Sequence, residues 1–308
     1  MRNVFVFSLV DHGTAWLVYA EWKFLEEQKD YLVQLLRFFA GRIKDDGSED
    51  LPDARFVDWP TADKPDVIHA GLQGILRMAF QSGEFLCREL GEDETAEICK
   101  NASEKLAQHI PNHCANKQAA ALLALSGLAD PVKMTNDVIK RGGAQGFSTF
   151  MGYYMLCAMG EAGDLEDALN IIREYWGAML KRGATTFWED FNMAWLEGSS
   201  RIDEIVPEDV KDLHGDYGAY CYKGFRHSLC HGWASGPAAF LSEYVLGIKP
   251  AAPGCKEVTI RPNLGDLEWV KGTYPTPYGI IRVEHRRKED GTIDSKIELP
   301  EGVSLVSR

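Results

Sequence analysis

The sequence predicts a mainly α-helical ring of the α/α-toroid type, followed by a small β-rich module. Segments of 10–20 residues with helical periodicity follow one another through short links, with no strand pattern between them. Several of them, such as 118–128 and 150–159, are apolar on nearly every side, as expected of helices enclosed by neighbours. Enclosed helices alternate with half-exposed ones along the chain. This alternation favours a fold in which the helices form two concentric rings. The change of composition after Gly247 predicts the β module.

The helical pattern extends from about residue 14 to residue 246. Apolar residues in 31–43 follow the i, i+3, i+4, i+7 rule closely, and Asp45-Asp46-Gly47 should end that helix. A loop rich in proline and aspartate follows at 48–66. Helices are expected at 14–28, 31–43, 67–90, 94–110, 115–128, 131–141, 148–162, 165–181 and 228–246, with Gly91 as a stop and Asp93, Asp130 and Asp164 as N-caps. A stack of helical repeats is the alternative, but no period of 34 or 40 residues is found.

The sequence pattern after Gly247 predicts a small β domain. Ile248-Lys249-Pro250 and Pro253-Gly254 break the helical pattern. Alternation of buried and exposed positions, as at Val258 and Ile260, is typical of half-buried strands. We expect an antiparallel sheet packed on the helical ring, with strands at 257–261, 267–272, 279–286 and 295–299.

Composition excludes several classes of partner and site. Acidic residues outnumber basic ones by 46 to 33, and a surface of that sign repels nucleic acid and anionic membranes. The cysteines are odd in number and contain no CxxC, which argues against a disulfide framework or a zinc site. Reduced, mostly buried thiols are expected at Cys87, Cys99, Cys114, Cys157, Cys221, Cys230 and Cys255.

The first residues do not read as a targeting or membrane segment. The apolar run from Val4 to Val10 is too short to span a bilayer. It follows a single Arg2 and meets Asp11 and His12 where a cleavage site should be, so a buried segment is the better interpretation. The chain as it stands is expected to be soluble and cytoplasmic, and periplasmic or secreted if the natural N-terminus lies upstream.

The stretch 183–195, GATTFWEDFNMAW, is the most informative for chemistry. It places Trp188 beside Glu189, and an aromatic ring beside a carboxylate suits sugar chemistry. The ring offers an apolar face to a pyranose. It also excludes water from the carboxylate, so that the pKa of the carboxylate can be shifted. A capped loop whose aromatics turn into the core is the alternative.

Two further features could carry chemistry. Asp58-Trp59 repeats the pairing of carboxylate and tryptophan, although DWP is also an ordinary turn. His227 and His231 stand at i, i+4, a spacing that can bind a metal, but no HExxH or third ligand accompanies them. A histidine that donates to a sugar hydroxyl, or a satisfied histidine at a helix end, therefore fits better. No P-loop, strand-borne GxGxxG or GxSxG is present, and no metal or cofactor is expected.

Five stretches in order resemble bacterial α-L-rhamnosidases of glycoside hydrolase family 78. They occupy 56–60 (FVDWP), 184–192 (ATTFWEDFN), 214–237, 241–254 and 258–279, and the likeness is dense from Thr185 to Gly279. The resemblance implies an (α/α)6 barrel of the six-hairpin glycosidase type, followed by a C-terminal β-sandwich. It also implies an exo-acting, inverting glycosidase that removes terminal L-rhamnose from glycosides or oligosaccharides.

The resemblance also implies roles for particular residues. Glu189 matches the general base that activates water, and His231 matches the histidine that contacts the sugar. Trp59 is similar to a wall of the rhamnose pocket. The flanking residues expected in or near the site are Trp188, Trp233 and Asp58.

One departure from the family pattern concerns the general acid. The motif DxxxRER followed by WTGD, which carries that acid in the family, is absent, and about nine helices are counted where the family has twelve. We therefore expect an incomplete barrel at 1–247 and a β-sandwich domain at 248–308. Asp11, Asp58 and Asp63 are candidate substitute acids.

Three functions are consistent with this pattern. The first is an α-L-rhamnosidase-like hydrolase. The second is a carbohydrate-binding, catalytically inactive remnant or one half of a split enzyme. The third, least favoured, is a helical scaffold, which has no need of aromatic–carboxylate pairs. An incomplete barrel should also expose apolar helix faces, so we expect self-association or docking with a separate N-terminal segment.

Overall fold

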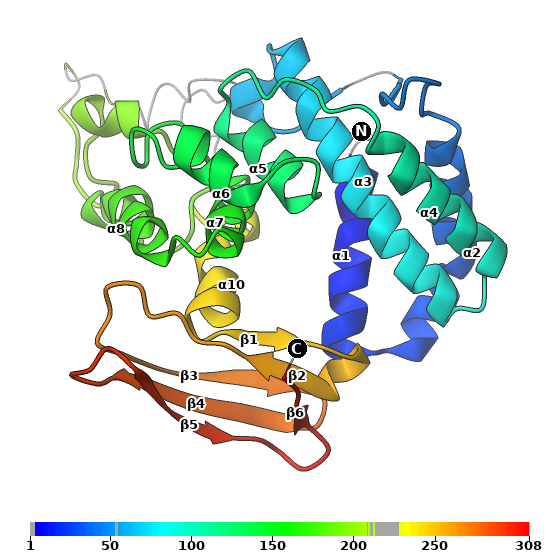
Figure 1. Ribbon diagram of the computed structural model, residues 1–308. Coiled ribbons are helices and arrows are strands. Elements are labelled where there is room, and N and C mark those ends of the chain that lie inside the picture. The colour runs from blue at the N-terminus through cyan, green and yellow to red at the C-terminus, as the bar shows by residue number, and fades with distance from the viewer. Residues whose placement is uncertain (1–3, 53–54, 208, 210–211, 213–227, 308) are drawn as a thin grey trace.

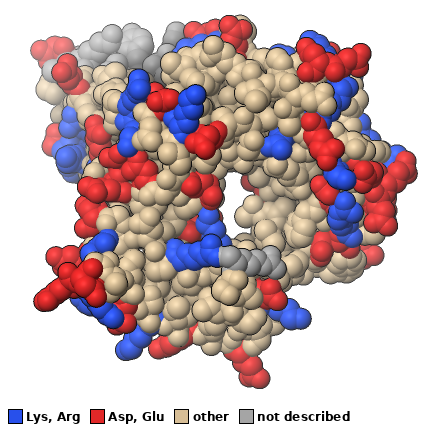
Figure 2. Space-filling model, in the orientation of Figure 1, with Lys and Arg blue, Asp and Glu red and all other residues tan. Residues whose placement is uncertain are grey.

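The computed structural model describes residues 4–52, 55–207, 209, 212 and 228–307 (Figure 1). Helices α1 to α4 form one side of the molecule, helices α5 to α8 and α10 form the other, and two small sheets lie beneath both groups. The space-filling view shows an opening through the molecule between the two groups of helices (Figure 2). The chain is thus mainly helical with a β-rich end, as the sequence predicts.

The first two helices meet at a corner that the periodicity does not reveal. α1 spans Val4–Tyr19 and α2 spans Trp22–Ala40, so the expected boundaries at 14–28 and 31–43 are wrong. The chain turns at Ala20, whose φ of +48° is left-handed. Alanine is the best helix former, so sequence propensity gives no sign of this break.

The next helices follow the predictions closely. α3 (Pro65–Glu89) ends before Gly91, whose φ of +69° suits its expected role as a stop. α5 (Lys117–Leu125) is the enclosed helix predicted at 115–128, and its residues 118–124 are all buried. The remaining helices on this part of the chain are α4 (Asp93–Leu106), α6 (Pro131–Met134), α7 (Gly152–Glu161) and α8 (Leu165–Lys181), with a π-helical segment η2 (Thr135–Ile139) after α6.

The expected N-caps have different outcomes. The Asp130 carboxylate accepts a hydrogen bond from the Lys133 N–H at 2.7 Å and caps α6, as predicted. Asp164 occupies the N-cap position of α8 without a side-chain cap bond, and its carboxylate instead contacts the Lys140 ammonium. The prediction for Asp93 is wrong by one residue, because Glu92 is the N-cap of α4.

The expected helix at 228–246 is only partly present. His231 is extended, with φ −130° and ψ 114°, and the short 3-10 turn η4 (Gly232–Ala234) follows it. Helical structure begins only at α10 (Gly236–Phe240) and continues as the π-helical η5 (Leu241–Val245). Gly232, the first residue of η4, and Gly236, the first of α10, weaken helix propensity there. The prediction that His227 and His231 stand one helical turn apart is therefore wrong at His231, and His227 lies outside the described residues.

The β-rich end forms two three-stranded sheets in the described chain. The strands are β1 (Ile248–Pro250), β2 (Glu257–Ile260), β3 (Trp269–Thr276), β4 (Gly279–Arg287), β5 (Ile293–Glu298) and β6 (Ser304–Leu305). One sheet has the order β1-β2-β6 and the other β3-β4-β5. The four expected strands are confirmed with shifted ends. β1 and β6 were not expected, and β6 pairs parallel to β2, so the β1-β2-β6 sheet is mixed rather than antiparallel as expected.

Two general features complete the fold. Of the described cysteines, Cys87, Cys99, Cys157 and Cys255 are buried free thiols, while Cys114 and Cys230 are exposed; Cys221 lies outside the described residues. Within the described chain, every helix is too short or too polar to cross a membrane.

Candidate functional site

Glu189 lies at the centre of a network that joins segments far apart in sequence. Its backbone N–H donates to the Ser228 carbonyl oxygen at 2.8 Å, and its Oε2 accepts from the Ser228 N–H at 2.7 Å. The Glu189 carbonyl oxygen accepts from the Trp233 indole N–H at 2.6 Å and from the Thr149 hydroxyl. Three of these bonds hold the Glu189 backbone and one holds its carboxylate, so three residues from two distant segments fix its position.

The Glu189 carboxylate lies beside partly exposed groups. Its side chain is 16% exposed, and the Nδ1 atom of His231 lies 3.8 Å from Oε2, with the imidazole side chain 34% exposed. The His231 ring packs on Trp233 at 4.5 Å between ring centroids, and Trp233 stacks on Phe150 at 5.4 Å. A carboxylate, an imidazole and an indole are thus within reach of one small ligand.

Asp58 is buried beneath this surface. Its Oδ1 accepts from the Trp59 N–H at 2.9 Å, and its Oδ2 accepts from the Ser148 hydroxyl at 2.6 Å and from the Gln118 amide at 3.0 Å. Burial raises the pKa of Asp58 to about 6, although the three donors act in the opposite direction. Trp59 itself is 37% exposed and packs edge-on against Phe56.

Asp190 is a third acidic residue in this region, which sequence reasoning missed. Its Oδ1 accepts from the Phe191 N–H at 2.8 Å, while Oδ2 is buried without a hydrogen-bond partner in the described structure. Burial, with smaller contributions from the charges of Asp58 and Glu189, raises the pKa of Asp190 to about 7. The acidic doublet Glu189-Asp190 is the one sequence signal that could have drawn attention to it.

The expected site residues fall into two layers. Trp59, Glu189, His231 and Trp233 reach the surface, whereas Asp58 is buried. Trp188 is fully buried and packs edge-on against Phe191 at 6.0 Å between ring centroids.

Of the three candidate acids, Asp11 lines a cavity. This cavity has a volume of about 190 Å³ and lies between α1 and the α7–α10 side, where Phe150, Tyr154 and Trp233 also line it. A larger cavity of about 500 Å³, lined by residues of α1, α10, η5 and β3, also includes Asp11. Asp63 is exposed in a turn outside both. No group of three potential metal ligands is found among the residues whose positions are described.

Comparison with known proteins agrees with the fold and with the sequence stretches. Residues 247–306 match the model of the bacterial alpha-L-rhamnosidase C-terminal domain. Over 131 residues the chain is 30% identical to an alpha-L-rhamnosidase of Alteromonas sp. (strain LOR), a match that covers 42% of this chain and 12% of that protein. The chain resembles the C-terminal part of α-L-rhamnosidases.

Solved rhamnosidases share the fold across nearly the whole chain. The GH78 family rhamnosidase of Bacillus sp. GL1 superimposes with a TM-score of 0.71 and 21% identity, covering 98% of this chain and 33% of its own. The Streptomyces avermitilis alpha-L-rhamnosidase, complexed with L-rhamnose, gives 0.69 and 16% over 96% of this chain and 29% of its own. This chain therefore spans about a third of the length of these rhamnosidases.

Proposed function

We propose that the chain carries the water-activating part of an inverting exo-α-L-rhamnosidase site. The position of Glu189 is the observation that carries this proposal. Its side chain is 16% exposed beside the His231 imidazole; the Ser228 N–H donates to its carboxylate, and Trp233 and Thr149 donate to its backbone carbonyl oxygen. A general base needs this combination of access and fixed orientation.

Inverting hydrolysis requires two carboxyl groups about 6.5–9.5 Å apart, on opposite faces of the sugar. In the proposed mechanism Glu189 takes a proton from water, and the resulting oxygen attacks the anomeric carbon as the glycosidic bond breaks. An acid on the other face protonates the leaving oxygen. Asp58 does not suit that role, because it is buried and both of its oxygens accept hydrogen bonds.

The complementary acid is proposed to come from a segment that the incomplete barrel lacks. We propose that residues 1–247 form part of an (α/α)6 barrel and that 248–308 form a β-sandwich domain. We propose that further helices of the barrel would pack beside the opening between the two helix groups (Figure 2). On this proposal the chain is one half of a split site. Asp11, which lines the two cavities between the helix groups, is the acid present in this half that could substitute.

The remaining site residues are proposed to bind and position the sugar. Trp59 and Trp233 offer ring surface to the C–H face of a pyranose, and His231 donates to a hydroxyl. Trp188 and Asp58 support the surface from below, since both are buried. The proposed substrate class is a glycoside or oligosaccharide with terminal L-rhamnose, which the rhamnose complex of the Streptomyces relative supports.

A carbohydrate-binding remnant without turnover is the second candidate. One observation supports it: Asp58 and Asp190, the two carboxyl groups that lie near Glu189, are buried, whereas Trp59 and His231, which we propose bind the sugar, are partly exposed.

Hydrolysis of an aryl α-L-rhamnoside by the purified chain tests both candidates. Turnover that Glu189→Gln abolishes, but that Glu197→Gln retains, supports the hydrolase; Glu197 is an exposed glutamate on η3 (Met193–Gly198) and serves as the matched control. Rhamnose binding without turnover, lost in Trp59→Ala, supports the remnant. If the chain neither binds nor cleaves, both candidates are wrong.

A further inference from the structure

One flank of α2 carries a row of half-exposed aromatic rings. Phe24, Tyr31 and Phe38 are 46%, 39% and 36% exposed and stand seven residues apart. Gln28 and Leu35, which lie between them, are of intermediate exposure. Spacings of four and three residues alternate along these five side chains, which is the repeat of a helix–helix seam. We call them the α2 stripe.

The α2 stripe lies on the flank of α2 away from α4; Phe24, at its start, also lines a pocket beside α1, and Leu35 packs partly against the core. The core-facing side chains of α2 are Leu25, Leu32, Leu36 and Phe39. On the flank toward α4, Arg37 pairs with Glu94 at 3.0 Å and Lys29 pairs with Glu92. At 100° per residue, the stripe lies about 90° from the core-facing side and opposite this flank. α2 stands at the outer edge of the molecule, with α4 beside it (Figure 1).

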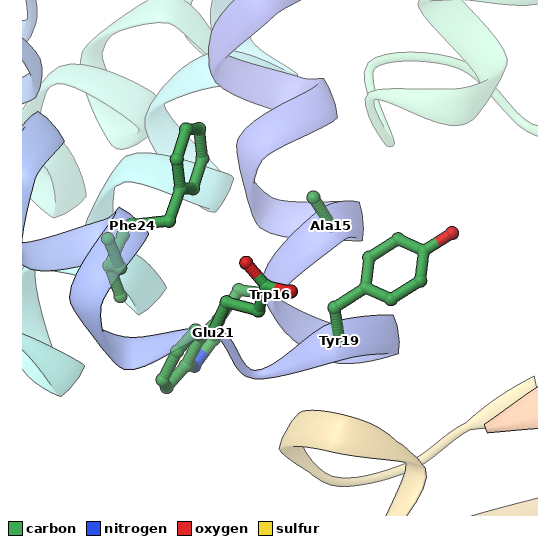
Figure 3. Close-up of a pocket in the computed structure, with 6 residues that line it drawn as sticks. Ala15, Trp16, Tyr19, Glu21 and Phe24 are labelled. Carbon is green, nitrogen blue, oxygen red and sulfur yellow. The ribbon is translucent and has the colours of Figure 1, made fainter. Parts of the chain in front are cut away.

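The two ends of the α2 stripe carry opposite charges. At its start, Glu21 and Phe24 line a pocket of about 300 Å³ at the corner between α1 and α2 (Figure 3). At its end, the Arg42 guanidinium lies 5.0 Å from the centre of the Phe38 ring. No ion pair of Glu21 or Arg42 is found with any residue in the described part of the chain.

We propose that the α2 stripe is the interface with a second copy of this chain, packed antiparallel about a two-fold axis at Tyr31. Phe24 and Phe38 lie seven residues before and after Tyr31. The axis therefore packs Phe24 of one copy against Phe38 of the second copy, and Phe38 of the first against Phe24 of the second. Glu21 lies ten residues before Tyr31 and Arg42 eleven after it, so the same axis brings opposite charges together twice. A symmetric dimer requires a surface that is complementary to itself. Binding to a helix of a different sequence would not require this symmetry in the α2 stripe.

This dimer is independent of the proposed hydrolase. It depends on the α2 stripe and its charged ends, and its measurement is the size of the particle rather than turnover. A chain that dimerises without cleaving rhamnosides contradicts only the proposed hydrolase, and an active monomer contradicts only the dimer.

Sedimentation velocity of the purified chain, from about 1 to 100 µM, tests the interface. We expect dimers that dissociate on dilution. Tyr31→Glu places two like charges at the axis and should weaken the dimer at least about tenfold. The matched control is Gln34→Glu, on the exposed polar side of the same helix, which should leave the dimer unchanged. Circular dichroism and melting of each variant show whether the fold is retained.

A charge exchange tests the antiparallel orientation. Glu21→Arg alone and Arg42→Glu alone each place like charges at both ends of the dimer and should weaken it. When the two variants are mixed, opposite charges face each other at both ends, and the dimer should return as a mixed species.

Three results would overturn the proposal. The first is a monomer throughout the concentration range, in which case a different helix or none covers the α2 stripe. The second is a dimer that folded Tyr31→Glu leaves unchanged, and the third is failure of the mixed charge variants to pair.

Discussion

Glu189 and Ser228 exchange two hydrogen bonds across 39 positions of sequence, from Glu189 N–H to Ser228 O and from Ser228 N–H to Glu189 Oε2. The second bond turns the carboxylate toward the segment that carries His231. The pair therefore joins the proposed base and the proposed sugar-binding histidine into one structural unit. The proposed roles of Glu189 and His231 therefore both depend on the contact between these two segments.

Trp233→Phe should lower the stability of this unit while an aromatic ring is kept at position 233. The substitution keeps the stacking on Phe150 but removes the indole N–H that donates to the Glu189 carbonyl oxygen. Because Thr149 still donates to that oxygen, we expect a loss of only about 1 kcal/mol in urea unfolding. Trp269→Phe, at a 52% exposed position on β3, is the control and should change stability by less. Equal effects would show that the bond to Glu189 contributes nothing.

Asp190→Asn should stabilise the protein at high pH. Burial raises the pKa of Asp190 to about 7 from 3.8, so the folded state binds its proton more tightly than the unfolded state. The protein therefore loses stability as the pH rises through that interval, and the asparagine variant does not. Urea unfolding at about pH 8 should show the variant more stable by about 2–4 kcal/mol, with little difference at about pH 4. Parallel pH curves would contradict the raised pKa.

Asp58→Asn should behave differently, although the pKa of Asp58 is also raised, to about 6. The Oδ2 atom of Asp58 accepts from two donors, Gln118 and Ser148, and Oδ1 accepts from a third. An amide cannot accept at both ends, so at least one donor is left without its partner. At about pH 8, where Asp58 is ionised and both of its oxygens accept, Asp58→Asn should therefore gain less stability than Asp190→Asn, by about 1–3 kcal/mol. Equal gains in the two variants would show that the three bonds do not matter.

Gly74→Ala should disturb the packing of α3 against α5 and lower stability. A Cβ atom at Gly74 would lie 2.7 Å from the Leu122 carbonyl oxygen, which is backbone and cannot move alone. We expect a loss of about 1–3 kcal/mol, visible as a lower midpoint in thermal or urea unfolding. Gly177→Ala on α8 is the control: nothing lies within 4 Å of its Cβ, so the better helix propensity should raise stability by up to about 1 kcal/mol.

Trp59→Ala and Trp188→Ala should separate binding from stability. Trp59 is 37% exposed, so its loss should abolish rhamnose binding, as measured by calorimetry, with a small effect on melting. Trp188 is fully buried, so its loss should cost about 3–5 kcal/mol. Rhamnose binding that survives in Trp59→Ala would remove this ring from the proposed pocket.

Much of the helical part could be predicted because its signals are local. The all-apolar pattern of α5 predicts an enclosed helix, and Gly91 and Asp130 act as stop and cap through contacts with their own backbone neighbours. Glu189 was also singled out by its position next to Trp188, although its proposed role as base comes from the resemblance to the rhamnosidases. These features depend on residues a few positions apart, which a sequence shows directly.

Other features depend on contacts between distant segments. Periodicity places His231 on a helix, but its N–H donates to the Phe187 carbonyl oxygen at 2.7 Å, and its backbone is extended. The raised pKa of Asp190 arises from burial, which its sequence neighbours do not reveal. By itself the sequence determined the mainly helical part, the β-rich end and the position of Trp188 next to Glu189, because these follow from spacing along one chain. Only the tertiary structure decided which acids are buried and which groups surround Glu189, because solvent exclusion and hydrogen bonding arise when distant segments meet.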